Sequence, residues 1–356
     1  MAEHPHFVEV AVDGRLICTV CPRNCKLQDG QRGFCFVRQR QGADIALTTY
    51  GRSSGFCMDP VEKKPLYHFL PGSAVLSFGT AGCNLGCKFC QNWSISTSRY
   101  MDTVQQSASP LSIANAARSL GAESVAYTYN DPVVFLEYAF DTAALCHEQG
   151  VKNIAVTAGY INAGARESFF RHMDAANEDL KAFSESFYRR MCSASLAPVL
   201  ETLEYLHSET NVWVEITTLL IPGENDSEAE LHELTEWIAD RLDPETPLHF
   251  TAFHPDYHLQ RHLPTSLTSL KRAAQIATDS GLKHVYLGNT GTSVRSATHC
   301  ANCGELLIKR RVYEVTEWNL NAAGCCSACG AGLKGNFKAA AGTWGNRTQP
   351  VRLGAN

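Results

Sequence analysis

The stretch GTAGCNLGCKFC, residues 79–90, places Cys83, Cys87 and Cys90 at spacings of four and three. The apolar run that leads into it, residues 74–80, is predicted to be a β-strand. A four-iron cluster normally takes one cysteine on each iron, so three cysteines in one loop leave one iron with an open coordination position. Zinc is the alternative, but zinc takes four ligands and no fourth Cys or His follows closely; the nearest, His68, precedes the strand. The loop therefore predicts an iron–sulfur cluster at which chemistry takes place.

The chain around this loop alternates between short β-branched or aromatic runs and amphipathic stretches of helical period. Strands are predicted at residues 74–80, 124–129, 151–157, 176–181, 212–220, 249–254 and 284–289. Helices fit between them at residues 111–120, 133–149, 162–172, 197–208, 227–241 and 266–280, and the last two begin at good N-cap residues, Asp226 or Ser227 and Thr265 or Ser266. This rhythm predicts an α/β fold, a complete or partial (β/α) TIM-type barrel that carries its functional residues at the C-terminal ends of the strands.

Both ends of the chain differ in composition from the predicted barrel. We expect a small N-terminal Cys-rich lobe at residues 1–72, the barrel at 73–295, a zinc-ribbon-like segment at 296–335 and a flexible tail at 336–356. The tail is rich in Gly, Ala and Asn, which is why we expect it to be frayed.

The 356 residues include 15 cysteines, more than packing requires, and most of them stand in groups. Cys300 and Cys303, followed by Cys326 and Cys329, form two CxxC pairs that indicate a structural zinc site, with a rubredoxin-like iron as the minor alternative. Cys325 stands next to Cys326 and competes with it as the ligand. A further set fits either zinc or a second iron–sulfur cluster, because spacing alone does not distinguish them: Cys18, Cys21, Cys25 and Cys35.

The CxxxCxxC spacing, with Phe89 before its last cysteine, resembles the radical SAM superfamily. The flanking residues 64–72, 91–93 and 281–289 are similar to the radical SAM enzymes of the AmmeMemoRadiSam system, relatives of the pyruvate formate-lyase activating enzyme. The resemblance implies that Cys83, Cys87 and Cys90 hold a 4Fe-4S cluster at which S-adenosylmethionine (SAM) is cleaved reductively to a 5'-deoxyadenosyl radical. It also implies hydrogen abstraction from a protein or peptide substrate, an electron donor such as flavodoxin or ferredoxin, and Memo-like and AMMECR-like partner proteins.

Residues at the predicted strand ends are candidates to bind SAM. Asn130 and Asp131 stand where the superfamily receives the amino group of the cofactor, although Asp131 is one methylene shorter than the usual Glu. Asp131 also fits the N-cap of the following helix, and both roles are compatible. Asp179 and Lys181 share one face of a strand, and the resemblance implies that they contact the ribose and the carboxylate; a structural ion pair is the alternative.

Four further residues complete the candidate SAM site. Phe89 is expected to border the adenine, and Thr157 ends the third strand. Glu215 is expected to meet the ribose or a hydrogen-bonded network, and His254 resembles the ribose-contacting histidine of the activating enzyme.

Composition excludes several other classes of function. The formal net charge of −5 argues against a nucleic-acid partner, and no apolar window or leader-like N-terminus suggests a membrane span or secretion, so we expect a cytoplasmic protein. Two rival functions remain, a radical SAM methylase and a non-catalytic, zinc-rich interaction protein.

Overall fold

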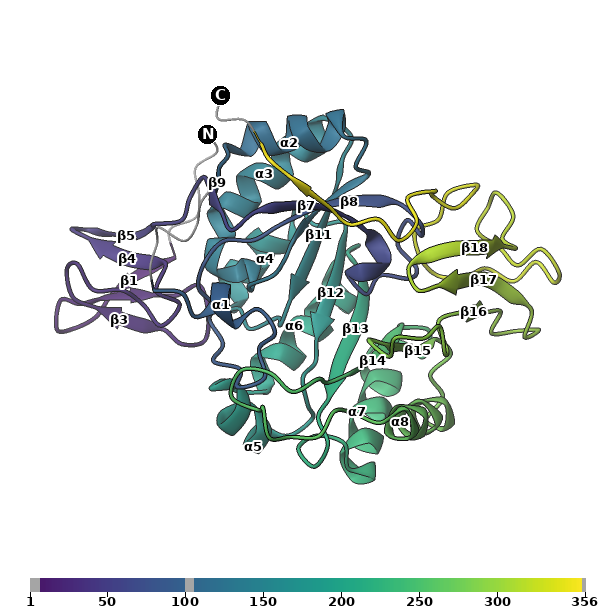
Figure 1. The fold of residues 1–356 in the computed structure, drawn as a ribbon. Coiled ribbons are helices and arrows are strands. Elements are labelled where there is room, and N and C mark those ends of the chain that lie inside the picture. Colours follow the sequence, from purple (N-terminus) through teal and green to yellow (C-terminus); the bar gives the residue numbers. More distant parts are fainter. Residues whose placement is uncertain (1–6, 100–105, 354–356) are drawn as a thin grey trace.

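The computed structural model describes residues 7–99 and 106–353, and parallel strands form its centre (Figure 1). These strands are β8 (Ala74–Phe78), β10 (Ser124–Tyr127), β11 (Lys152–Thr157), β12 (Ala175–Asp179), β13 (Trp213–Leu220), β14 (Leu248–Ala252) and β15 (Val285–Gly288). β7 (Phe56–Pro60) and β19 (Gln349–Val351) extend the sheet antiparallel. Within the described ranges the order is β15-β14-β13-β12-β11-β10-β8-β7-β19, with β15 and β19 as open edges. The fold is therefore α/β and a partial barrel, as the sequence predicts.

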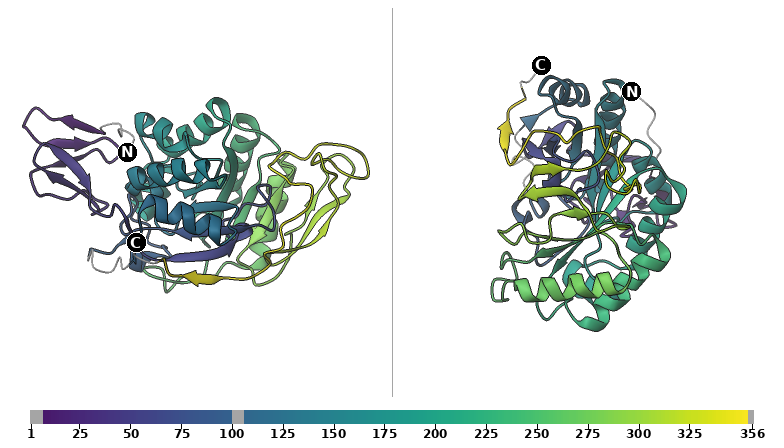
Figure 2. Two further views of the ribbon diagram at one scale, coloured as in Figure 1. Left: turned by 90° about the horizontal axis from the view of Figure 1, so that it is seen from above. Right: turned by 90° about the vertical axis from the view of Figure 1, so that its right-hand side faces the viewer.

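Helices cover the outer face of this curved sheet (Figure 2). They are α2 (Pro110–Ser119), α3 (Leu136–Glu148) with the preceding turn η3 (Pro132–Phe135), α4 (Ala163–Phe170), α6 (Ala197–Glu209), α7 (Glu228–Arg241) and α8 (Leu267–Asp279). The Ser227 and Ser266 side chains accept hydrogen bonds from Glu230 N and Ser269 N, so they are the caps of α7 and α8. Strand residues such as Val125 and Ile154 are fully buried because side chains pack on both faces of the sheet. Among the described residues, every helix is too short or too polar to cross a membrane.

Short helical segments follow the C-terminal ends of two strands. They are α1 (Trp93–Ser96), after the cysteine loop of residues 79–90, and α5 (Glu185–Phe187) with the helical turn η4 (Tyr188–Cys192), after β12. The sequence periodicity did not predict them, since they are too short to show a helical repeat.

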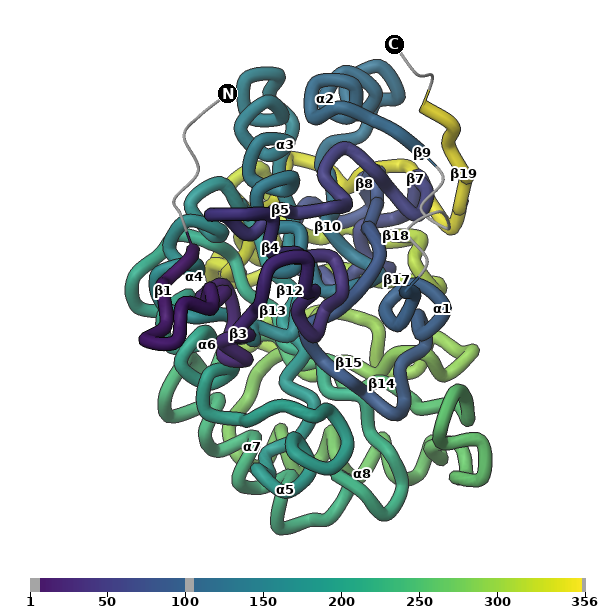
Figure 3. The backbone as a smooth tube through the Cα atoms, turned by 90° about the vertical axis from the view of Figure 1, so that its left-hand side faces the viewer, coloured from purple at the N-terminus to yellow at the C-terminus, as the bar shows by residue number. Residues whose placement is uncertain are grey.

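The N-terminal lobe lies against the C-terminal ends of the barrel strands (Figure 3). Its elements are β1 (Val8–Val10), β2 (Leu16–Cys18) and β3 (Cys25–Leu27) in one antiparallel sheet, the hairpin of β4 (Arg38–Gln41) and β5 (Asp44–Leu47), and β6 (Arg52–Ser53) paired with β9 (Gln106–Ser107). A Cβ on Gly82, whose φ is +78°, would collide with the carbonyl oxygen of Cys35. The lobe therefore touches the cysteine loop of the barrel. β7, which lies within the expected lobe, is a strand of the central sheet.

The C-terminal unit lies on the opposite side of the barrel (Figure 1). It contains an antiparallel sheet of β16 (Thr298–His299), β17 (Leu306–Arg311) and β18 (Glu314–Trp318). Lys334 of this unit pairs with Asp243 at 2.7 Å, in the turn that leads into β14, so the unit sits at the N-terminal ends of the strands.

The sequence predicts a flexible tail at residues 336–356. The described part of that segment, residues 336–353, instead packs on the barrel. Asn336 exchanges backbone hydrogen bonds with His68 and Leu70, at 2.7 and 2.8 Å, and β19 pairs with β7. Gly342 packs so closely on Gly72 that a Cβ on either would collide with the other. The glycines of this segment thus permit a close approach to the sheet rather than disorder.

Candidate active site

The cysteine loop of residues 79–90 is held in place by the end of the neighbouring strand. Asn130, after β10, donates from Nδ2 to the carbonyl oxygens of Gly82 and Ala81, at 2.7 and 3.2 Å, and accepts from Thr80 N at 2.9 Å. All of these groups are buried, so the amide is already committed to the loop. Asn130 lines the cavity as predicted, but its contacts position the cysteines rather than leaving it free for a cofactor.

The other side of the loop is fixed by backbone hydrogen bonds. Gly86 N donates to Cys192 O at 2.8 Å, and Lys88 N donates to Met191 O at 2.9 Å. Lys88 O in turn accepts from His258 N at 3.1 Å. These bonds join the middle of the cysteine loop to η4 and to the segment after β14.

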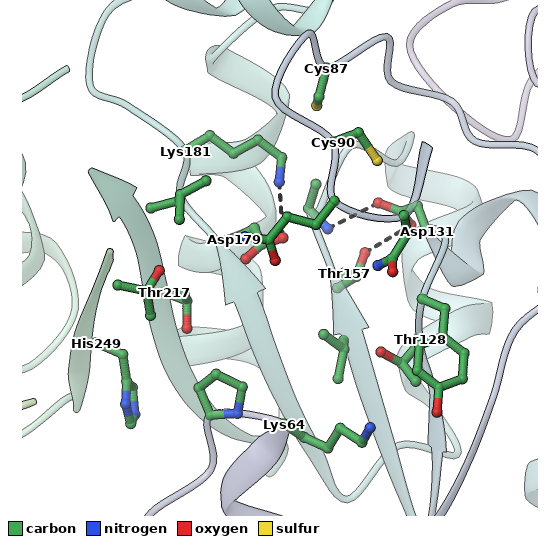
Figure 4. A pocket seen from close by; sticks show the side chains of 18 of the residues that line it. Lys64, Cys87, Cys90, Thr128, Asp131, Thr157, Asp179, Lys181, Thr217 and His249 are labelled. Atoms are coloured by element: carbon green, nitrogen blue, oxygen red, sulfur yellow. Dashed lines mark hydrogen bonds and ion pairs between the residues drawn. The ribbon is translucent and has the colours of Figure 1, made fainter. Parts of the chain in front are cut away.

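Cys83, Cys87 and Cys90 line a cavity of about 480 Å³ inside the barrel, and Cys87 and Cys90 lie at one end of it (Figure 4). Burial raises the pKa of the Cys83 and Cys90 thiols, so both are protonated until a metal displaces the proton. Among the described residues that line this cavity there is no fourth cysteine, and the one histidine, His249, is bonded to Glu215. This donor set fits a 4Fe-4S cluster with one iron left without a protein ligand.

Asp131 connects the ends of β10 and β11 within the cavity wall. Its Oδ1 accepts from Val133 N at 3.1 Å and from Thr157 Oγ1 at 3.0 Å, and its Oδ2 accepts from Ala158 N at 2.9 Å. Burial raises the pKa of this carboxyl against the opposing effect of these hydrogen bonds. The predicted capping role is present, and Thr157 lies beside it as expected.

Asp179 and Lys181 project into the same cavity from the end of β12 (Figure 4). Lys181 Nζ pairs with Asp179 Oδ2 at 2.9 Å and lies 6.0 Å from the centre of the Phe89 ring. Burial opposes the charge on Lys181, but Asp179 and the neighbouring Cys87 outweigh it and raise the pKa of the ammonium. The ion pair predicted as the alternative is formed, and it stands where a zwitterionic ligand could exchange partners with it.

Glu215 and His254 do not line the cavity. β13 starts at Trp213, so Glu215 is near the beginning of its strand, where it takes part in a hydrogen-bonded network, one of the two roles expected for it. Its carboxylate is fully buried and accepts from His249 Nε2 at 2.7 Å and from the backbone N–H groups of Tyr67 and His68 at 2.9 and 2.7 Å. The exposed His254 lies beyond the end of β14 with its Nε2 3.1 Å from Asn289 O.

Sequence reasoning missed a charged cluster at the opposite end of the cavity from the cysteines (Figure 4). Lys64 and Lys63 each place Nζ 2.8 Å from a different oxygen of Asp59, and the Lys64 ammonium lies 5.1 Å from the centre of the Tyr129 ring. Lys64 and Asp59 are buried. Residues 64–72 carry part of the family resemblance, which is a sequence signal that could have pointed to this cluster. The sequence pattern does not show, however, that these residues face the barrel interior.

The four ribbon cysteines (Cys300, Cys303, Cys326 and Cys329) form a second candidate metal site, remote from the cavity. Their Sγ atoms all lie within 4.8 Å of one another, with pairs at 3.7 and 3.8 Å. A tetrahedron with metal–sulfur bonds of about 2.3 Å has an edge of about 3.8 Å, so one tetrahedral ion fits. Cys326, not Cys325, belongs to the group.

Known proteins resemble this chain in sequence and in fold. Residues 78–235 match the family model of the radical SAM superfamily. Over 325 residues the chain is 37% identical to an uncharacterized protein of Methanocaldococcus jannaschii, a match that covers 91% of this chain and 96% of that protein. The structure is similar to a radical SAM methyltransferase from Sphaerobacter thermophilus (17% identity, TM-score 0.49, 67% of this chain and 71% of that chain). It is also similar to a domain of pyruvate-formate lyase-activating enzyme from Bacteroides vulgatus (19% identity, TM-score 0.42, 47% and 99%).

Proposed function

The chain belongs to the radical SAM superfamily, and on this premise we propose that it cleaves SAM reductively at a 4Fe-4S cluster held by Cys83, Cys87 and Cys90. The observation that carries the proposal is the convergence of three thiols and a charged pair on one cavity at the C-terminal ends of the strands. When bound, the cluster supplies the electron that breaks the S–C5' bond, which gives a 5'-deoxyadenosyl radical for hydrogen abstraction.

The residues of this chain would bind and orient SAM. Lys181 would meet the carboxylate of the methionyl group, Asp179 the ribose and Asp131 the amino group, and all three residues line the cavity. Phe89, which is buried and lies between two cluster ligands, would border the adenine. The buried wall around these groups limits water at the reacting atoms.

We propose a protein or peptide as the substrate, in an activase reaction or a post-translational modification. An aromatic pair supports this choice, because Trp93 is 42% exposed and stacks on the half-buried Tyr257 with ring centroids 5.5 Å apart. Trp93 directly follows Gln91 and Asn92, which line the cavity, so the pair flanks its rim. Exposed aromatic side chains are enriched where proteins bind other proteins.

The proposed reaction needs partners. A flavodoxin or ferredoxin would supply the electron, and Memo-like and AMMECR-like proteins are the proposed partners in the modification. Zinc is the proposed occupant of the ribbon cysteines, where the sulfur spacing supports it.

Anaerobically reconstituted protein, mixed with SAM and dithionite, should form 5'-deoxyadenosine and methionine. Cys87→Ala should abolish both products, whereas the matched control Cys325→Ala, outside the ligand groups, should keep them. Absence of 5'-deoxyadenosine from iron-loaded wild-type protein would contradict the proposal, and formation of S-adenosylhomocysteine would favour a methylase.

A further inference from the structure

The N-terminal cysteine set (Cys18, Cys21, Cys25 and Cys35) surrounds one small cavity. Cys18 and Cys25 are cross-strand partners in β2 and β3, Cys21 lies in the turn between them, and all four residues line the cavity. The rest of the lining combines the apolar side chains of Val20, Val133 and Val134 with polar and charged ones from Asn84, Arg23 and Arg38. All four thiols are free. Two hairpin residues, a turn residue and a loop residue therefore bring four sulfurs to one place.

The sulfurs of this set are spaced more widely than the ribbon cysteines. Among the described residues, the ribbon cysteines are the one group in which three or more ligand atoms lie within 4.8 Å of one another. A single tetrahedral zinc ion requires sulfurs about 3.8 Å apart, which the ribbon provides and the N-terminal set does not. The same is true of the proposed ligands of the barrel cluster, because the ligand atoms of Cys83, Cys87 and Cys90 do not all lie within 4.8 Å of one another. Both the N-terminal set and the cysteines of the barrel loop therefore fall outside the spacing of a single tetrahedral ion.

Hydrogen-bond donors surround the N-terminal sulfurs. Phe34 N lies 3.4 Å from Cys25 Sγ, and backbone N–H groups of Val20, Arg23 and Val37 lie near the other three sulfurs. Arg38 lines the cavity, is 4% exposed and, within the described chain, leaves Nε without a hydrogen-bond partner. Its other guanidinium nitrogens bind Glu137 at 2.7 and 2.8 Å. Donors of this kind stabilise the negative charge of a thiolate-bound cluster.

The N-terminal set also lies directly beside the cysteine loop of the barrel. The carbonyl oxygen of Cys35 fills the space where a Cβ of Gly82 would be. The Arg23 guanidinium donates to the carbonyl oxygens of Asn84 and Ser193, and Asn84, next to Cys83 in sequence, lines the N-terminal cavity. One backbone segment thus separates the two groups of thiols.

We propose that Cys18, Cys21, Cys25 and Cys35 hold a second iron–sulfur cluster of the 4Fe-4S type rather than zinc. With a cysteine on every iron, this cluster has no position for SAM and acts as an electron carrier beside the catalytic one. The proposal goes beyond the proposed function, since SAM cleavage by the barrel cluster does not require it.

The test uses the full chain with its catalytic cluster removed. In the triple variant Cys83→Ala, Cys87→Ala, Cys90→Ala, the N-terminal lobe keeps its residues while SAM cleavage is lost. After anaerobic reconstitution and desalting, metal analysis should give about four irons and about four sulfides per chain, besides about one zinc in the ribbon. Reduction should produce the EPR signal of a 4Fe-4S cluster, and SAM should leave that signal unchanged.

A second variant distinguishes a specific site from adventitious iron. Adding Cys21→Ala and Cys25→Ala to the triple variant should remove the iron and the EPR signal but leave the ribbon zinc. The proposal is overturned if the triple variant contains about two zincs or one zinc and no iron, or if the iron survives in the quintuple variant. Failure of the proposed function would instead appear in the wild-type protein, as iron without 5'-deoxyadenosine.

Discussion

The two terminal cysteine groups lie at opposite ends of the same barrel and differ in geometry. The ribbon cysteines form a tight tetrahedron next to the N-terminal ends of the strands, whereas the N-terminal cysteine set is wider and touches the loop of the catalytic cysteines. In barrels the N-terminal ends of the strands carry stability and the C-terminal ends carry chemistry. The two cysteine groups therefore differ in their position relative to the strands as well as in the spacing of their sulfurs.

The largest effect is expected from the ribbon. Cys303→Ala removes one of four ligands from a site whose metal binding drives folding of the segment, so stability should fall by on the order of several kcal/mol. Zinc analysis and thermal unfolding of the purified protein measure this loss. Cys325→Ala is the matched control and should keep the zinc and the melting temperature. Equal zinc content in both variants would place the structural metal elsewhere.

Glu215 tests the same end of the barrel through a hydrogen-bonded network with residues 67, 68 and 249. Glu215→Gln leaves buried N–H groups of residues 67 and 68 and the His249 ring without their full acceptor, which should cost about 3–5 kcal/mol in the free energy of unfolding. Denaturant unfolding measures the cost, and the exposed Glu201→Gln is the control. A loss below about 1 kcal/mol would show that the network does not anchor residues 64–70.

The contribution of Glu215 should depend on pH in a defined direction. Its pKa is lowered to about 2, because hydrogen bonds from His249 and from backbone groups outweigh the effect of burial. A carboxyl with a depressed folded-state pKa stabilises the protein above its unfolded value of about 4.3, and this stability is lost as pH falls toward about 2. The stability gap between wild type and Glu215→Gln should therefore shrink between about pH 4 and pH 2. A gap that widens on acidification would contradict this assignment.

A substitution of Asn130 tests how the C-terminal ends of the strands hold the cysteine loop in position. Asn130→Ala removes the hydrogen bonds to the carbonyl oxygens of Gly82 and Ala81, which should cost about 1–3 kcal/mol and misplace the cysteine loop. Reconstituted iron should fall, and the yield of 5'-deoxyadenosine per iron should fall with it. Asn211→Ala, at an exposed position, is the control. Normal yield per iron in Asn130→Ala would limit the residue to a role in stability.

The smallest effect is expected from a single SAM contact. Asp179→Asn should weaken SAM binding about five- to tenfold, the equivalent of about 1–1.4 kcal/mol, because a charged hydrogen bond becomes neutral. Equilibrium binding of SAM to the reconstituted protein measures the change, and the exposed Asp240→Asn should bind normally. Unchanged affinity in Asp179→Asn would leave the Asp179–Lys181 pair as a structural feature.

The sequence predicted the fold and most of the site because both follow from local patterns. Strand ends placed Asp131, Thr157, Asp179 and Lys181 in the cavity, and the cysteine loop follows the first barrel strand as expected. Glu215 does not line the cavity, because it stands near the start of β13 and not near the end that carries the cysteine loop. Of its two expected roles, the hydrogen-bonded network is the one that the structure shows.

The features that the sequence could not predict depend on contacts between distant residues. Arg310 of β17 donates to Tyr67 O at 2.6 Å, and this contact joins the C-terminal unit to the segment that places Lys64 in the cavity. The tail became part of the sheet through backbone pairing, which leaves no periodic signal in so short a strand. The pairing of β19 with β7 joins segments that are hundreds of residues apart, and no local sequence pattern predicts such a contact.

The central claim is that the cluster of Cys83, Cys87 and Cys90 has an iron that binds SAM. Electron–nuclear double resonance of the reduced, reconstituted protein with SAM labelled by ¹⁵N at the amino group tests it directly. The account predicts a hyperfine coupling from the labelled nitrogen to the cluster, present in Cys325→Ala and lost in Cys87→Ala. Absence of the coupling from wild-type protein in which the cluster of Cys83, Cys87 and Cys90 is fully formed and reduced, at saturating SAM, would contradict it.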